Sequence, residues 1–171
     1  MTFLDENYKQ PEQKSNYLKF KKDWDTKFRV MSDSITGYIY FNKDVKPVRS
    51  KEEPKEADRK ANAKTNDKWD LDQVKHFRAF VVRDYASESL CILEVTQKTI
   101  QTAILAYYKN EKRGDPKDYD LVVTRDDKSD ITKYTVIADP KELLTEKQAW
   151  AILDSKIDLD KLYTNEDPFS S

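Results

Sequence analysis

The sequence predicts a mostly β fold in which five strands form a barrel and one helix lies between the third and fourth strands. Short runs of β-branched and aromatic residues recur between residues 27 and 138, and polar turn residues separate them. A single stretch within this region, from Gln97 to just before Gly114, has the three-and-four spacing of a helix. The predicted order is therefore β-β-β-α-β-β.

Each run has its own signal. The expected strands are residues 27–41, 74–84, 90–95, 120–125 and 131–138. The first is interrupted by Ser32, Asp33 and Ser34 and is expected to bend or split near Gly37. The helix carries an apolar stripe of Ile100, Ala103, Ile104 and either Tyr107 or Tyr108. A helix between strands three and four is the order of a five-stranded OB-type barrel, which binds nucleic-acid strands across one face.

Polar segments surround this predicted barrel domain of residues 26–140. Residues 1–25 are expected to form an N-terminal arm. Residues 42–70 are almost entirely polar, which predicts a long mobile loop with a helical stretch around residues 52–64. Residues 141–171 predict a C-terminal helix, which begins with a capping box of Thr145 and Gln148, and then an acidic tail.

Composition argues against several classes of protein. The only cysteine, Cys91, lies in an apolar run and the only histidine is His76, so neither a disulfide framework nor a zinc site is expected. Glycine-rich phosphate loops and calcium-loop spacings are also missing, so we expect no enzyme, cofactor or metal. No run reaches the roughly 20 apolar residues of a membrane span. A cytoplasmic protein is expected, in the host cell if a phage encodes it.

Aromatic and cationic residues alternate on the predicted strands, a pattern that suits single-stranded DNA. Aromatic rings stack on exposed bases for about 1–3 kcal/mol per base, while Lys and Arg neutralise phosphates. The candidate DNA-binding residues are Arg29, Tyr38, Tyr40, Lys43, Lys46, Arg49, Arg78, Phe80, Arg83, Arg125, Lys133 and Tyr134. The alternative for each aromatic residue is that it fills the core instead of contacting DNA. The pattern leaves open whether Phe77 or Phe80 faces inward. Residues 43–68 are interpreted either as a flap that closes over the bound strand or as a solvated linker.

Several motifs resemble the single-stranded-DNA-binding proteins of tailed bacteriophages. They are the runs His76 to Tyr85, Ile92 to Ile100, Gly114 to Leu121 and Thr132 to Val136, and the likeness covers about residues 17–163. The resemblance implies an OB fold, protection of single strands in replication, recombination and repair, and no catalytic activity. The end of the chain also resembles the acidic tips that recruit replication or recombination proteins, through Glu166, Asp167, Pro168 and Phe169.

The charge distribution raises two further points. Residues 1–70 carry 16 Lys and Arg against 13 Asp and Glu, whereas residues 139–171 carry 4 against 8. An acidic tail that folds over a basic groove is one expectation, and deletion of residues 159–171 would then tighten DNA binding. The net charge of −1 favours the alternative function, an OB-fold scaffold of a replication or recombination complex without useful DNA affinity.

Overall fold

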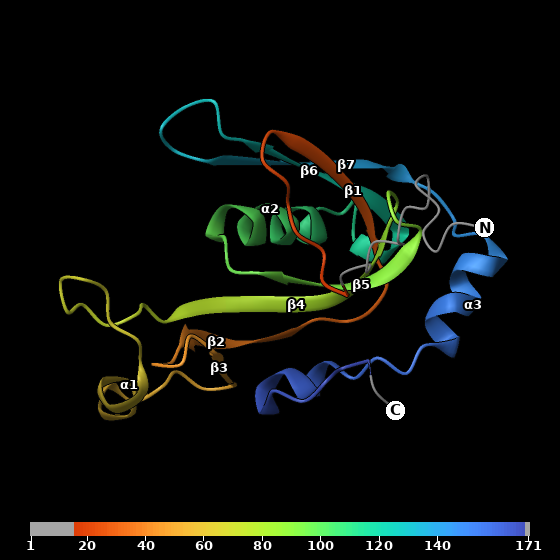
Figure 1. The fold of residues 1–171 in the computed structure, drawn as a ribbon. Helices are drawn as coiled ribbons and strands as arrows, with labels where there is room; N and C mark the ends of the chain where they lie inside the picture. Colours follow the sequence, from red (N-terminus) through yellow and green to blue (C-terminus); the bar gives the residue numbers. More distant parts are fainter. Residues whose placement is uncertain (1–15, 170–171) are drawn as a thin grey trace, which may run out of the picture.

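Strands dominate the computed structural model, which describes residues 16–169 (Figure 1). The strands are β1 (Trp24–Val30), β2 (Ile35–Phe41), β3 (Pro47–Ser50), β4 (Lys75–Asp84), β5 (Ser89–Val95), β6 (Tyr119–Asp126) and β7 (Lys133–Lys141). The helices are α1 (Glu56–Asn62), α2 (Lys98–Lys109) and α3 (Glu146–Asp154), with 3₁₀ turns η1 (Pro116–Asp118) and η2 (Leu159–Thr164). The predicted mostly β class is confirmed.

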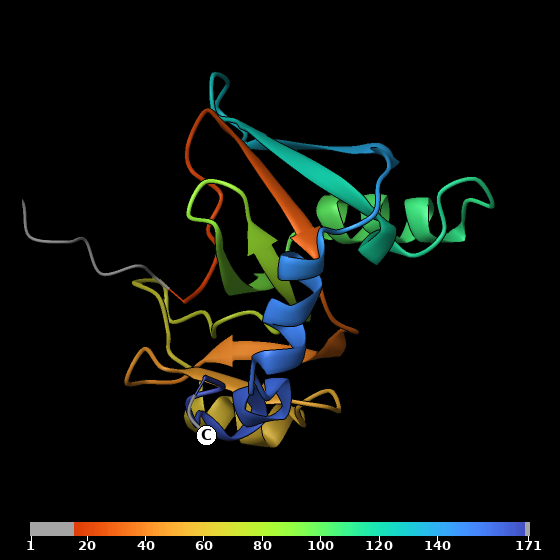
Figure 2. The same cartoon turned by 90° about the vertical axis from the view of Figure 1, so that its right-hand side faces the viewer.

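All strands pair antiparallel in one sheet of order β3-β2-β4-β1-β6-β7, and β5 pairs with β4. β4 is long enough to pair with β2 through residues 75–79 and with β1 through residues 82–84. β1 then pairs with β6 along its length. The views in Figures 1 and 2 place β1, β6 and β7 on one side of α2, and β2 and β3 on the other.

The predicted closed five-stranded barrel is not formed. Within residues 16–169, β5 pairs with β4 and β7 pairs with β6, but β5 and β7 do not pair with each other. α2 contacts both of these strands, and the Tyr107 hydroxyl donates a hydrogen bond to the Val136 carbonyl of β7. Its buried Ile100 and Ile104 share one core cluster with side chains of β5 and β7. The helix therefore packs at the seam, and the sheet stays open there.

The predicted first strand is divided at a different place from the one expected. The break lies at residues 31–34, between β1 and β2, whereas Gly37 lies inside β2 and pairs with Phe77. A Cβ at Gly37 would lie 2.4 Å from the Ser50 carbonyl oxygen and 2.9 Å from the Phe77 ring. Glycine is therefore required at residue 37 by close backbone approach, not by a bend.

The segment of residues 42–70 contains more regular structure than the long loop that was predicted. Residues 47–50 form β3, which extends the sheet beside β2, and the helix α1 falls inside the stretch for which helix was expected. The sequence signal for β3 was weak because the strand has only four residues, one of them Pro47. The predicted arm also differs, since β1 begins at Trp24; residues 1–15 lie outside the described part of the chain.

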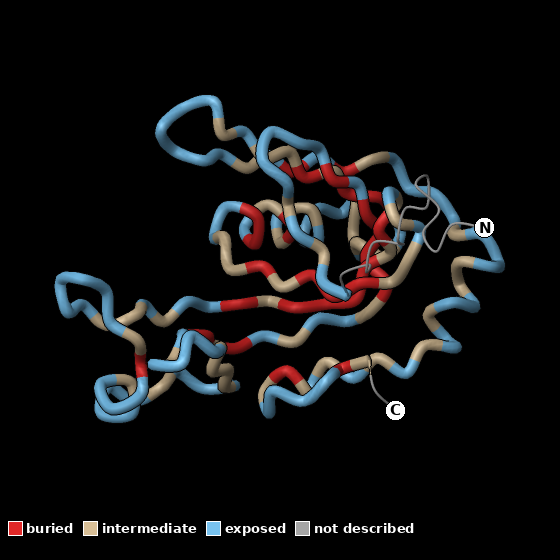
Figure 3. The backbone as a smooth tube through the Cα atoms, in the orientation of Figure 1, coloured by how far each residue is buried: buried red, intermediate tan, exposed pale blue. Residues whose placement is uncertain are grey.

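Two apolar clusters lie on opposite faces of β4, and Figure 3 shows the buried segments converging there. Phe80 and Val82 belong to the first cluster, with α2, β1, β6 and β7. Phe77 and Ala79 belong to the second, which Leu162 of η2 completes. The open question of which phenylalanine faces the core is thus answered: both are buried, one in each cluster.

A buried ion pair joins β1 to β6. Arg29 is 2% exposed, and its Nε donates to Asp120 Oδ1 over 2.7 Å. The Tyr85 hydroxyl donates to the same carboxylate oxygen over 2.7 Å. Burial, together with the hydrogen bond and negative charge of Asp120, raises the pKa of Tyr85 to about 12. Burial also raises the pKa of Tyr119 to about 12.

These tyrosines predict a loss of stability at high pH. Their pKa values are raised above the ordinary value near 10, so the folded state holds the phenolic protons more tightly than the unfolded state does. The contribution is complete below about pH 10 and is lost as pH rises towards 12. Urea unfolding of the wild type between pH 8 and 12 should show this decline, and the Tyr85→Phe/Tyr119→Phe variant a shallower one. Identical pH dependence would contradict the assignment.

Candidate nucleic-acid interface

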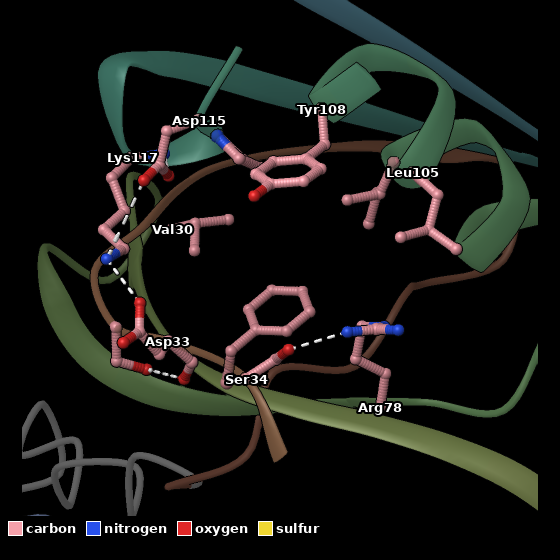
Figure 4. A pocket seen from close by; sticks show the side chains of 12 residues that line it. Val30, Asp33, Ser34, Arg78, Leu105, Tyr108, Asp115 and Lys117 are labelled. Atoms are coloured by element: carbon pink, nitrogen blue, oxygen red, sulfur yellow. Dashed lines mark hydrogen bonds and ion pairs between the residues drawn. The ribbon is translucent and has the colours of Figure 1, made fainter. Parts of the chain in front are cut away.

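A hollow that combines apolar and charged groups lies between β4 and α2, and we call it the β4–α2 pocket (Figure 4). Its volume is about 360 Å³. The lining comes from the β1–β2 connection, β4, α2 and the residues around η1: Val30, Ser32, Asp33, Ser34, Arg78, Phe80, Ile104, Leu105, Tyr108, Asp115, Pro116 and Lys117. Three parts of the chain that are distant in sequence therefore meet at one site: the β1–β2 connection, β4, and α2 with the residues around η1.

The pocket has an apolar base and one aromatic wall. Phe80 and Ile104 are buried core residues whose surfaces also line the pocket. Leu105 and Tyr108 project from α2, as Figure 4 shows, on the side opposite Ser34 and Arg78. The Tyr108 side chain is 57% exposed, so its ring is accessible to a ligand as well as to solvent. A planar apolar group would find contacts on both sides here.

Arg78 supplies the polar wall on β4. Its Nη1 donates to Ser34 Oγ over 2.8 Å. Its Nε is buried and has no hydrogen-bond partner among the described residues. A buried donor without a partner is rare in folded proteins and costs about 1–3 kcal/mol. The Nε atom is enclosed by the protein, while the guanidinium as a whole lines the pocket and contributes its positive charge there.

An ion pair closes the opposite rim. Lys117 Nζ lies 2.6 Å from Asp33 Oδ1 and 3.9 Å from Asp115 Oδ2. The hydrogen bond from Lys117 lowers the pKa of Asp33, and the same bond raises the pKa of Lys117. Asp33 thus stays ionised and Lys117 protonated over the physiological range. In this rim, Asp33 comes from the β1–β2 connection and Lys117 from η1.

A pair of aromatic rings lies next to the pocket on the same face of β4. His76 and Arg78 share a face because they are two residues apart on one strand. Tyr38 is the cross-strand partner of His76, and the two rings meet edge to face with centroids 5.6 Å apart. Gln101 of α2 fixes His76, through a 3.0 Å contact to Nδ1 and a hydrogen bond from its amide to the His76 carbonyl. Of the predicted site residues, the fold therefore brings Tyr38, Arg78 and Phe80 onto one face.

Three of the predicted residues are buried. Arg29 is committed to the buried pair with Asp120, and Tyr40 and Phe80 are 4% and 2% exposed. Phe80 contributes only to the base of the pocket. A base cannot stack on Tyr40 where it lies, and a phosphate cannot reach Arg29. Alternation along the strand could not identify Phe80 as buried, because both faces of β4 are covered.

The other predicted cations lie away from the pocket or are paired. Arg49 forms a two-pronged pair with Glu94, on the face of the sheet opposite Arg78, and Arg83 stacks over the ring of Tyr85. Lys43 and Lys46 are exposed in the turn between β2 and β3. None of these four lines the β4–α2 pocket.

The β6–β7 end forms a separate group. Arg125 pairs with Asp127 at 2.9 Å and donates to the Phe20 carbonyl. Tyr134 packs edge to face on Phe20, and Lys133 is exposed at the start of β7. The hydrogen bond from Thr132 contributes most to lowering the pKa of Asp127. These predicted residues are therefore near one another, but they lie at a different part of the molecule from the pocket.

The predicted partner-binding tip is folded onto the sheet. Pro168 is buried, and Phe169 packs against the second cluster and edge to face on Tyr17, with centroids 6.4 Å apart. Glu166 and Asp167 are exposed. The tip thus presents its acidic side chains while its apolar side chains contribute to the fold.

Residues that the sequence reasoning did not select complete the site. Leu105 was absent from the predicted stripe, and the choice between Tyr107 and Tyr108 stayed open. Tyr107 turns to β7 and Tyr108 to the pocket. Lys117 directly follows Gly114, Asp115 and Pro116, a motif whose only sequence signal is its family likeness. Tyr107 faces inward, so its neighbour Tyr108 faces outward from the helix. This was the sequence signal that could have identified Tyr108.

The described residues hold no group of three or more His, Cys, Asp or Glu side chains arranged to bind a metal ion. No helix among them has the length and apolar character that a membrane crossing requires. Comparisons with protein-family models, with curated proteins and with solved structures found no match to this chain. The likeness to phage single-stranded-DNA-binding proteins therefore depends on the short motifs alone.

Proposed function

We propose that this protein binds single-stranded DNA without catalysing a reaction, and that it protects such strands during replication, recombination and repair. The single observation that carries the proposal is the β4–α2 pocket, where an accessible tyrosine faces an arginine. Accessible aromatic rings combined with cations are the means by which proteins hold single strands.

The order of pairing supports an OB-type fold for the proposal. β1 and β2 together act as one bent strand that pairs with both β4 and β6, and the β4–β5 and β6–β7 hairpins flank α2 in sequence. An OB-type barrel that is open between its third and fifth strands would have this order of pairing. OB folds are often partly open, and many bind oligonucleotides.

The chemistry of the face supports the choice of a single strand. Tyr108 and the Tyr38–His76 pair offer ring surfaces on either side of Arg78. Duplex DNA keeps its base faces stacked, so only an unpaired strand can use these rings. With a net charge of −1, the whole molecule would add little nonspecific attraction.

A direct test is the anisotropy of a labelled dT 20-mer, titrated with protein at several salt concentrations. We expect binding that weakens as salt rises, because phosphate contacts release counterions. Tyr108→Ala should weaken the affinity about 5- to 150-fold, which corresponds to loss of one stacked base. Lys112→Gln is the matched control, since Lys112 is exposed beyond α2 and does not line the pocket. No binding at low salt, or affinity that salt does not change, would refute the proposal.

A second candidate function is a scaffold that binds proteins and not DNA. The observation in its favour is α3, none of whose side chains is buried by residues 16–169. Trp150 and Leu153 of α3 and the neighbouring Leu143 are 55%, 72% and 96% exposed. A scaffold would leave the dT 20-mer unbound at every salt concentration, so the same titration separates the two functions.

A further inference from the structure

We propose that Trp69 is a second stacking site for the bound single strand, held outward by a rigid turn near the start of β4. This inference rests on the proposed binding of single-stranded DNA and adds a contact outside the β4–α2 pocket. Trp69 is 84% exposed, more than any other Phe, Trp or Tyr among residues 16–169. A base can therefore reach its ring while the protein keeps its conformation.

The backbone of Trp69 is the first sign that the ring has a role outside the fold. Its φ angle is 65°, in the left-handed region, where a side chain with a Cβ is sterically disfavoured and glycine is the usual residue. An exposed ring buries too little surface to offset that cost. Residues in such conformations cluster at binding sites, where the surrounding structure holds them in place.

Hydrogen bonds to Asn66 fix the turn of residues 66–70 around Trp69. Asn66 Oδ1 accepts from the backbone N–H groups of Lys68 and Asp70, over 2.9 and 3.0 Å. The Asn66 carbonyl accepts from the Trp69 N–H, and the Asn66 N–H donates to the Asp70 carbonyl, each over 3.0 Å. The ring is thus presented in one backbone conformation, so less conformational entropy is lost when a base stacks on it.

The turn is also anchored to the sheet. The Lys64 N–H donates to the Phe41 carbonyl at the end of β2, over 2.9 Å, and the Phe41 N–H donates to the Asp72 carboxylate over 2.8 Å. Figure 1 shows the connection between α1 and β4, which carries the turn, beyond the start of β4 and at the opposite end of the molecule from α3. His76 is the second residue of β4, so its ring pair with Tyr38 lies towards this end. A strand that passes from the pocket over this pair is directed towards Trp69.

The charge of this region favours a nucleic-acid strand as the ligand. Residues 42–70 carry nine Lys and Arg against seven Asp and Glu, an excess of positive charge in a chain whose net charge is −1. Lys68 is exposed next to Trp69, and Lys43 and Lys46 are exposed in the β2–β3 turn. The Lys43 N–H donates to the Asn62 carbonyl, so that turn lies beside the segment that leads to Trp69. A ring among cations suits a single strand, and stacking accepts every base, so no base preference is expected.

Tryptophan fluorescence tests the contact directly. The chain has three tryptophans, so Trp24→Phe/Trp150→Phe leaves Trp69 as the only one. The dT 20-mer should quench its emission, because a base stacked on an indole quenches it, and added salt should restore the emission. The control is Trp24→Phe/Trp69→Phe, which keeps only Trp150 of α3, and its emission should not change.

Affinity and stability together separate binding from a structural role. Trp69→Gly should bind the dT 20-mer about 5- to 150-fold more weakly, which corresponds to loss of one stacked base. Because glycine favours the left-handed region, the same variant should unfold at a urea concentration no lower than wild type does. Trp69→Phe keeps a ring and should recover most of the lost affinity. Trp150→Ala, at a tryptophan that is 55% exposed, should leave the affinity unchanged.

The outcomes separate the two proposals. If the dT 20-mer binds wild type and Trp69→Gly equally, or leaves the Trp69 emission unchanged, the second stacking site is refuted while single-strand binding stands. A lower urea midpoint for Trp69→Gly would assign the ring to the stability of the turn instead. If the dT 20-mer does not bind wild type at all, the proposed function is refuted, and the second site with it. If Trp69→Gly weakens binding and Tyr108→Ala does not, Trp69 stands and the pocket is not the main contact.

Discussion

Replacing Asp120 by alanine is expected to lower the free energy of unfolding by about 3–5 kcal/mol. Asp120 is 3% exposed and accepts hydrogen bonds from Arg29 Nε and from the Tyr85 hydroxyl. Without the carboxylate, the buried Arg29 guanidinium keeps only the carbonyls of Lys117 and Glu142 as acceptors. An uncompensated charge would then remain in the core.

Urea unfolding of wild type and Asp120→Ala measures this loss. Asp139→Ala is the matched control, because Asp139 also pairs with Lys27, at 3.6 Å, but its side chain is 37% exposed. The control should lose no more than about 1 kcal/mol. In the Arg29→Met/Asp120→Ala variant no charge is stranded, so its loss should be smaller than the sum of the single losses. A loss below 1 kcal/mol for Asp120→Ala would show that this pair does not hold β1 to β6.

Leu162→Ala should cost about 2–5 kcal/mol, the range for a fully buried leucine. Leu162 is 2% exposed and joins Ile39, Phe77, Ala79 and Ile92 in the second cluster. Deletion of residues 159–171 removes Leu162 together with Tyr163 and Phe169, which pack on the same cluster. The deletion should therefore be at least as destabilising, and it should expose enough apolar surface to bind the dye ANS.

Leu153→Ala is the control for this prediction, because Leu153 is 72% exposed on α3. It should change stability by less than about 0.5 kcal/mol. If Leu162→Ala were equally mild, the C-terminal segment would not be part of the core.

The prediction that deletion of residues 159–171 tightens DNA binding has to be tested with a milder variant, since the deletion also exposes the sheet. Asp160→Asn/Glu166→Gln removes two exposed charges and leaves the packing intact.

Local patterns in the sequence were sufficient for most of the regular structure. The two-residue period of strands and the three-and-four spacing of the helix depend only on near neighbours, so β4, β5, α2, β6 and β7 lie close to their predicted bounds. The capping box of Thr145 and Gln148 is likewise present at the start of α3. β3 was missed because four residues hold too little pattern to identify a strand.

Contacts between distant segments determined the rest. Whether β5 reaches β7 depends on where α2 packs, and no local pattern states this. Both faces of β4 are covered, one by α2 and one by η2, so Phe80 is buried although its sequence context resembles that of an exposed aromatic. The sequence by itself determined the strands, the helix and which aromatic and cationic side chains are present. Only the tertiary structure decided which of them meet, because the β4–α2 pocket is assembled from side chains up to 87 residues apart, from Val30 to Lys117.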